Sequence, residues 1–186
     1  RAALPELPDA KLGRFVTQYG LRPYDAAVLT ASRPVADYFE AAAAGADARA
    51  IANYVTGDLA RLLNASGQEI TDCKVTAPNL RDLLALRDGG KITNSTAKAV
   101  LEEMFQTGLT AQAIVDAKGL AAVSDDSAIT AEVDKAIAAN PDIVAKFKAG
   151  NEKSKNALTG QVMKAMKGQA RPDVVNRLID ERLAAL

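Results

Sequence analysis

Helix start and stop signals recur along the whole chain, whereas signals for β-strands are nearly absent. Proline stands where helices are expected to begin, as at Pro141 and Pro172, and glycine stands where they are expected to end, as at Gly108 and Gly119. Thr93 and Asn140 are expected to cap the helices that follow them. Aromatic residues make up only 4% of the chain, and alanine supplies much of its 48% hydrophobic share. Small aliphatic side chains favour close helix packing over sheets. The sequence therefore predicts an all-α protein.

Helical periodicity, read together with caps and breakers, predicts about ten or eleven short helices. A polar, glycine-containing loop is expected at 65–74, and residues 120–129 contain the best candidate for a domain boundary, where Ser124 or Asp125 caps the next helix. We therefore expect a helical bundle body, residues 1–123, followed by a small three-helix-type tail domain, residues 124–186. The expected helices are 9–19, 23–31, 34–44, 47–64, 78–88, 94–107, 111–118, 127–139, 142–166 with an interruption near Gly150, and 172–184.

Several chemistries are excluded by residues that the chain lacks. It contains no histidine, which excludes imidazole acid–base catalysis, Ser-His triads and histidine-ligated metals. A single cysteine, Cys73, excludes internal disulfides and is expected to be an unreactive, partly buried thiol. The segment DGGKIT at 88–93 is not a phosphate-binding loop, because Ala85 and Ile92 replace the glycine and the hydroxyl residue that the motif requires. No set of residues indicates catalysis.

The chain contains no long apolar run and does not open with a signal-peptide pattern. A cytoplasmic protein with no membrane partner is the resulting expectation. Because the first residue is Arg1 and not methionine, the sequence is also expected to be a processed or excised piece of something longer.

Positive charge is concentrated in one stretch near the C-terminus. Seven basic residues and one acid, Glu152, lie between Lys146 and Arg171, so this stretch has a net charge of +6 in a chain whose net charge is zero. On a helical wheel, an apolar stripe of Leu158, Val162, Ala165 and Met166 is expected to face the core. The opposite side carries Lys153, Gly160, Lys164 and Lys167.

The glycine in this lysine face has two interpretations. Relative to alanine, Gly160 costs roughly 0.5–1 kcal/mol of helix stability, and Lys164 beside Lys167 adds a small like-charge penalty. A solvated lysine face with a tolerated glycine is the more common outcome for a run of charge. The alternative is a bare backbone patch between cations, which lets a phosphate chain approach closely. Lys155 lies near the apolar edge and is expected to extend its amino group from there to solvent.

If the partner is a nucleic acid, the composition narrows the mode of binding. Phe147 is the only aromatic residue after Phe105, so stacking platforms for single strands are missing. Contacts to the phosphates and shape of a folded RNA are compatible with this surface. A few such contacts bind weakly and with marked salt dependence.

Three stretches of the chain follow a known pattern: LPELPDAKLGRFVTQYGLRPYDAAVLTASRPVADYFE (4–40), DGGKITNSTAKAVLEEMFQTG (88–108) and NPDIVAKFKAGNEKSKNALTGQVMKAMKGQARPDVVNRLI (140–179). Together they resemble the family that comprises the B subunit of the aspartyl/glutamyl-tRNA(Asn/Gln) amidotransferase and the YqeY-like proteins. The opening LPELP is more similar to the B subunit than to a free-standing YqeY-like protein.

The resemblance implies a function in an enzyme that uses ATP and glutamine-derived ammonia to convert Glu-tRNA(Gln) or Asp-tRNA(Asn) to the amide form. In that family the magnesium, the ATP site and the ammonia channel belong to an N-terminal part that is absent here, so no cofactor and no catalysis are expected in this chain. The same part is expected to contact the A and C subunits of the enzyme. The chain itself is expected to reach the tRNA body near its D-loop and elbow, and to bind neither DNA nor a membrane.

The resemblance also implies which residues contact the tRNA. Lys153, Lys164, Lys167 and Arg171 are expected to meet phosphates, Gly160 and Gly168 to permit close approach, and Gln161 or Asn156 to form hydrogen bonds. The stretch KNAL around Ala157 departs from the family pattern, which leaves individual contacts open. Alternatives are a module that braces the catalytic body or partner subunits, and a stand-alone YqeY-like protein.

Overall fold

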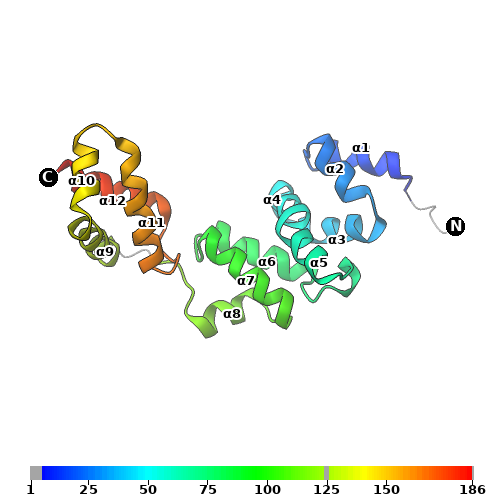
Figure 1. Cartoon of the computed structure of the whole chain (residues 1–186). Helices are drawn as coiled ribbons and strands as arrows, with labels where there is room; N and C mark the ends of the chain where they lie inside the picture. The colour runs from blue at the N-terminus through cyan, green and yellow to red at the C-terminus, as the bar shows by residue number, and fades with distance from the viewer. Residues whose placement is uncertain (1–5, 124–125, 186) are drawn as a thin grey trace. The chain divides into compact units, whose positions relative to one another are not determined.

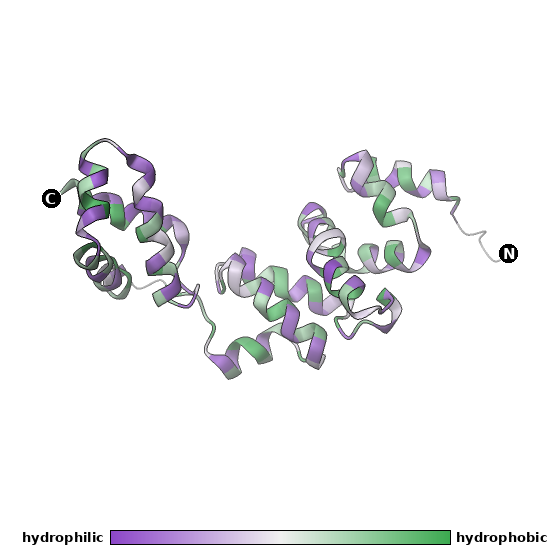
Figure 2. Ribbon diagram, viewed as in Figure 1, coloured by the Kyte–Doolittle hydropathy of each residue, from purple (hydrophilic) through white to green (hydrophobic). Residues whose placement is uncertain are grey.

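The computed structural model describes residues 6–123 and 126–185. As predicted, the described residues are all-α, with helices joined by short loops (Figure 1). Extended pairing among them is limited to one isolated parallel bridge between Val123 and Ala170. The helices carry hydrophobic residues alongside hydrophilic ones, as expected for helices that pack on one side (Figure 2).

The chain divides into two compact units. The first comprises 1–89 and 97–118, and the second comprises 90–96 and 119–186. The short segment 90–96, which the sequence assigns to the body, is thus grouped with the second unit. Ser124 and Asp125, the predicted caps at the domain boundary, lie outside the described residues, and the boundary itself stays a prediction.

The helix ends in the first part of the chain follow the predicted signals closely. Side chains of Ser32, Asp47 and Thr76 accept hydrogen bonds from the backbone at the starts of α3, α4 and α6. Gly67 adopts a left-handed conformation (φ +67°) and ends α5. The helices up to residue 118 are α1 (Pro8–Gln18), α2 (Pro23–Thr30), α3 (Arg33–Ala43), α4 (Ala48–Asn53), α5 (Ala60–Ser66), α6 (Ala77–Asp88), α7 (Asn94–Thr107) and α8 (Ala111–Lys118).

The helix predicted over 47–64 is interrupted by a π-helical segment at Tyr54–Leu59. The wider turns of this segment shift the faces of the helix that follows it. Helical spacing places Val55, Leu59, Leu62 and Leu63 on one face, yet only Val55 and Leu59 are buried, and Leu62 and Leu63 are half-buried. Local periodicity does not reveal such a segment, because the same residues also suit an uninterrupted α-helix.

Three aromatic rings pack together where α1 and α3 meet. Phe15 contacts Tyr19 and Phe39 with ring centroids 5.4 Å and 5.0 Å apart, and Tyr19 lies 5.2 Å from Phe39. Phe15 and Phe39 are completely buried. Beside this cluster, Arg14 forms ion pairs with Glu6 and Glu40, both at 2.6 Å. The cluster therefore joins α1 to α3 by apolar packing, with ion pairs at its edge.

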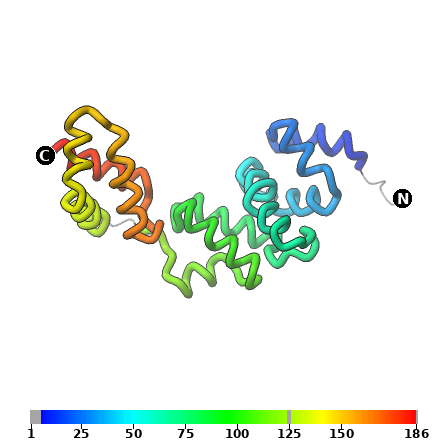
Figure 3. Tube along the Cα trace, in the orientation of Figure 1, coloured from blue at the N-terminus to red at the C-terminus, as the bar shows by residue number. Residues whose placement is uncertain are grey.

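The second unit contains α9 (Asp126–Ala139), α10 (Pro141–Lys148), α11 (Lys155–Ala165) and α12 (Pro172–Ala184). The helix predicted over 142–166 is two helices, separated by Gly150 (φ +93°) and a 3₁₀ turn at Glu152–Ser154. The chain reverses direction there, so that α10 packs beside α11 (Figure 3). Residues of the common core that are completely buried are Ile129, Val133, Leu158, Val162, Ala170, Val175 and Ile179.

We predict that Phe39→Ala lowers the free energy of unfolding by about 3–5 kcal/mol, because it removes a completely buried ring and leaves a cavity. Tyr24→Ala is the matched control, since Tyr24 is 77% exposed, and its effect should stay within about 0.5 kcal/mol. Chemical denaturation followed by circular dichroism measures both. Equal effects of the two substitutions would contradict this description of the core.

Candidate functional site

The lysine-rich surface is carried mainly by α11. Leu158 and Val162 anchor this helix in the core, and Met166 packs against the same core just beyond its end. Ala165, which the helical wheel assigned to the apolar stripe, is exposed, so that assignment is wrong. Ala165 is the last residue of α11, and it is not among the residues that form or contact the core of the second unit.

The opposite side of α11 is open to solvent. Gly160 and Lys164 lie there together with Asn156, and Lys153 stands in the 3₁₀ turn that leads into the helix; all four are exposed. Among the described residues, no partner forms an ion pair or hydrogen bond with the side-chain amino group of Lys153 or of Lys164. The structure thus brings together four of the predicted site residues on one face, while their roles stay predictions.

Gly160 has no role in packing within the chain. A Cβ atom placed on it would meet no atom within 4 Å, apart from the backbone of its own helix. Its backbone is helical and does not need glycine, since its φ lies outside the left-handed region. The cost of a glycine in this helix, roughly 0.5–1 kcal/mol, is therefore not offset by any contact in the described structure.

Lys167 does not lie on the helix face where the wheel placed it. It follows the end of α11 and has a φ of +52°, the only positive φ of a non-glycine residue among those described. Two hydrogen bonds close this end of the helix: Lys167 N–H to the Lys164 carbonyl (3.1 Å) and Gly168 N–H to the Met163 carbonyl (2.8 Å). This is a Schellman motif, in which the position of Lys167 usually holds glycine. A lysine there costs roughly 1–2 kcal/mol of backbone strain.

The turn at Lys167 and Gly168 is held in place by a segment about 75 residues away. The Thr93 hydroxyl donates to the Gly168 carbonyl oxygen at 2.6 Å, and the Ser95 hydroxyl lies 3.3 Å from the same oxygen. A Cβ on Gly168 would lie 3.1 Å from the Ser95 hydroxyl oxygen, and Gly168 has a φ of +72°. Gly168 is therefore required by the fold itself, whatever it also contacts.

The remaining predicted residues have partners within the chain. Arg171 pairs with Asp173 at 2.8 Å, and its guanidinium holds the pKa of that carboxyl below its ordinary value. Gln161 forms two amide hydrogen bonds with Asn140, of 2.8 Å and 3.1 Å. Because the Asn140 side chain is engaged there and with the Ala136 carbonyl, it does not cap α10 as predicted from Asn140-Pro141.

Lys155 agrees with its predicted position at the edge of the apolar stripe. It is partly buried, and its amino group forms a 2.6 Å ion pair with Asp180 of α12. It therefore serves the tail's own structure more than the open lysine face.

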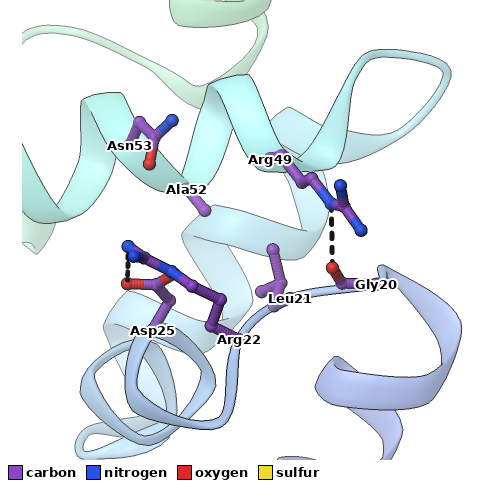
Figure 4. Close-up of a pocket in the computed structure, with 7 residues that line it drawn as sticks. All are labelled: Gly20, Leu21, Arg22, Asp25, Arg49, Ala52 and Asn53. Carbon is purple, nitrogen blue, oxygen red and sulfur yellow. Dashed lines mark hydrogen bonds and ion pairs between the residues drawn. The ribbon is translucent and has the colours of Figure 1, made fainter.

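Sequence reasoning missed a groove in the first unit. It lies between the loop before α2 and helix α4 and has a volume of about 550 Å³ (Figure 4). Arg22 in this groove pairs with Asp25, and Arg49 donates its Nε hydrogen to the Gly20 carbonyl at 2.9 Å. No motif in the sequence marks these residues, because they come from a loop and from two separate helices.

Neither a membrane span nor a metal-binding cluster was found in the described part of the chain. None of its helices has the length and apolar character needed to cross a membrane. Residues 6–123 and 126–185 also contain no group of three or more Cys, Asp or Glu side chains placed to hold a metal ion. The thiol of Cys73 is half-buried, as expected, and burial raises its pKa.

We predict that Gly160→Ala raises the free energy of unfolding by about 0.5–1 kcal/mol, because alanine is the better helix former and the added methyl group has open space. Gly168→Ala is the matched control and should destabilise the protein, because its φ is positive and Ser95 is close. Thermal denaturation of both variants measures the difference. A destabilised Gly160→Ala variant would show that this glycine has a structural role.

Comparisons with known proteins identify the family. A family model described as the GatB domain matches residues 37–183. The chain is 50% identical to the B subunit of the aspartyl/glutamyl-tRNA(Asn/Gln) amidotransferase of Carboxydothermus hydrogenoformans, covering 100% of this chain and 39% of that protein. It is 48% identical to the corresponding protein of Trichlorobacter lovleyi, covering 97% of this chain and 38% of that protein. The chain thus spans about two fifths of the length of the curated relatives it matches. These matches show that the chain belongs to the GatB/YqeY family.

Proposed function

We propose that this chain is the tRNA-binding C-terminal module of a glutamine- and ATP-dependent amidotransferase that converts Glu-tRNA(Gln) or Asp-tRNA(Asn) to the amide form. The relatives are named as the B subunit of an aspartyl/glutamyl-tRNA(Asn/Gln) amidotransferase. In this proposal the module acts in the cytoplasm and catalyses nothing by itself. ATP, magnesium and the contacts with the A and C subunits belong to the remainder of the full-length protein.

The observation that carries this proposal is the exposed glycine between lysines without partners. Gly160 destabilises its helix with no compensating contact in the described structure, and Lys153 and Lys164 are not neutralised by any described acid. Bare backbone between cations lets an RNA backbone approach α11 closely, and each lysine neutralises a phosphate. In this proposal, Gly160 makes α11 less stable but allows the RNA backbone to contact the helix there.

The proposed contacts give binding that depends on shape and charge more than on base sequence. Lysine contacts to phosphates carry no sequence information directly. The second unit offers Phe147 of α10 as its only aromatic side chain, so base stacking contributes little. The module would therefore add affinity for the body of the tRNA, and the remainder of the enzyme would read the acceptor end.

A structural module that braces the catalytic body is the competing function. In the first unit, the basic side chains of α1 form ion pairs with acids of α3, between Lys11, Arg14, Asp37 and Glu40. These two helices therefore present no comparable lysine face, which favours the bracing function for them. The two functions differ in what happens to tRNA binding when the lysine face is reversed in charge.

We predict that Lys164→Glu combined with Lys167→Glu weakens tRNA binding by the assembled amidotransferase about tenfold or more. The slope of log K against log salt concentration should fall by about 2, because two phosphate contacts are lost. Filter binding or fluorescence anisotropy over a series of salt concentrations measures both quantities.

The matched control combines Lys98→Glu with Lys135→Glu. It changes the net charge equally, but both lysines already pair with acids, Asp58 and Glu132. This control should leave the affinity and the salt slope nearly unchanged. If the Lys164 and Lys167 double variant behaved like the control, the bracing function would replace the proposed one.

A further inference from the structure

Lys91 lies outside every stretch so far assigned to the tRNA-facing surface, yet it belongs to the same compact unit as α11. Its carbonyl oxygen accepts a hydrogen bond from the Ala122 N–H at 2.7 Å, and the next N–H, of Val123, donates to the Gln169 carbonyl at 2.9 Å. Successive N–H groups of an extended segment point to opposite sides. Lys91 and Gln169 are therefore both bound to residues 122–123 through backbone hydrogen bonds.

A buried hydroxyl fixes this arrangement. Thr93 is only 7% exposed, and its hydroxyl donates to the Gly168 carbonyl while it accepts from the Thr96 N–H at 3.2 Å. A hydroxyl has one hydrogen to donate, and in Thr93 the Gly168 carbonyl accepts it. Thr93, two residues after Lys91, is thereby bound directly to Gly168, one residue after Lys167.

Both lysines at this corner are exposed and lack partners. Neither Lys91 nor Lys167 forms an ion pair or a side-chain hydrogen bond with any described residue, whereas Lys98, one turn into α7, pairs with Asp58 at 3.3 Å. Lys167 is additionally held in a strained backbone conformation at a position that usually holds glycine. Two exposed cations thus lie on two segments that hydrogen bonds join, and no described acid pairs with either of them.

We propose that Lys91 and Lys167 form a phosphate-binding corner, which extends the tRNA-facing surface from α11 to the segment that precedes α7. The inference rests on the proposed function, because it names a further contact point for the same RNA. The expected ligand is the sugar-phosphate backbone of a folded RNA, which presents several phosphates to both lysines and to Lys164 at once. Hydrogen bonds fix the backbone at Lys91 and Lys167, so the two lysines do not have to be brought together when the RNA binds.

The test replaces Lys91 with glutamine in the assembled amidotransferase and measures the binding of a tRNA(Gln) transcript at several salt concentrations. We expect the dissociation constant to rise about 3- to 10-fold and the salt slope to fall by about 1, as for the loss of one phosphate contact. Lys98→Gln is the matched control, because it removes the same charge from a lysine that is already paired, and it should leave both quantities unchanged.

The outcomes separate this inference from the proposed function. If Lys91→Gln binds tRNA as the unaltered protein does, while the Lys164 and Lys167 double variant binds weakly, the corner is wrong and the function stands. If none of these variants alters binding, both fail. Thermal denaturation of Lys91→Gln should match that of the unaltered protein, because the contact to Ala122 uses the backbone of Lys91; a large shift in the midpoint would overturn the assignment of a binding role.

Discussion

The hydrogen bond from the Thr93 hydroxyl to the Gly168 carbonyl is the contact on which the candidate surface depends. It joins residues 75 positions apart in the sequence at 2.6 Å. Together with the backbone bonds through Ala122 and Val123, it fixes the turn after α11 against the segment that precedes α7. The direction of Lys167 is set by this turn and by the Schellman hydrogen bonds, and not by the periodicity of a helix.

Two kinds of glycine lie along this surface, and they differ in what the fold requires of them. Gly168 needs its left-handed backbone and its lack of a side chain, because Ser95 fills the adjacent space. Gly160 needs neither, and a side chain there would point into open space. The fold accounts for the first glycine, whereas no contact in the described structure accounts for the second. The membership of the GatB/YqeY family makes a tRNA the proposed partner.

Local signals in the sequence were sufficient for the fold class and for most helix ends. The predicted helices 94–107 and 111–118 agree with α7 and α8, and Thr93 caps α7 as expected. Contacts between distant residues were not predictable from local patterns. The wheel therefore misplaced Ala165 and Lys167, and the pairing of Asn140 with Gln161 replaced an expected helix cap. The positions of Asn156, Gly160 and Lys164 on one face were predictable because α11 is regular there, whereas the 3₁₀ turn at Lys153 and the neighbourhood of Lys91 required the structure.

The most direct test of this account is the substitution Lys167→Gly, with unfolding and tRNA binding measured on the same protein. Glycine relieves roughly 1–2 kcal/mol of backbone strain at a positive φ. It also loses roughly 0.5–1 kcal/mol more conformational entropy on folding, so the free energy of unfolding should rise by roughly 0.5–1 kcal/mol. The same change removes a phosphate contact, so the affinity of the assembled enzyme for tRNA should fall, with a shallower salt dependence. If the backbone strain at Lys167 is retained because the lysine binds tRNA, the variant should be more stable and should bind tRNA less well. A variant that is more stable and binds tRNA unchanged would contradict it.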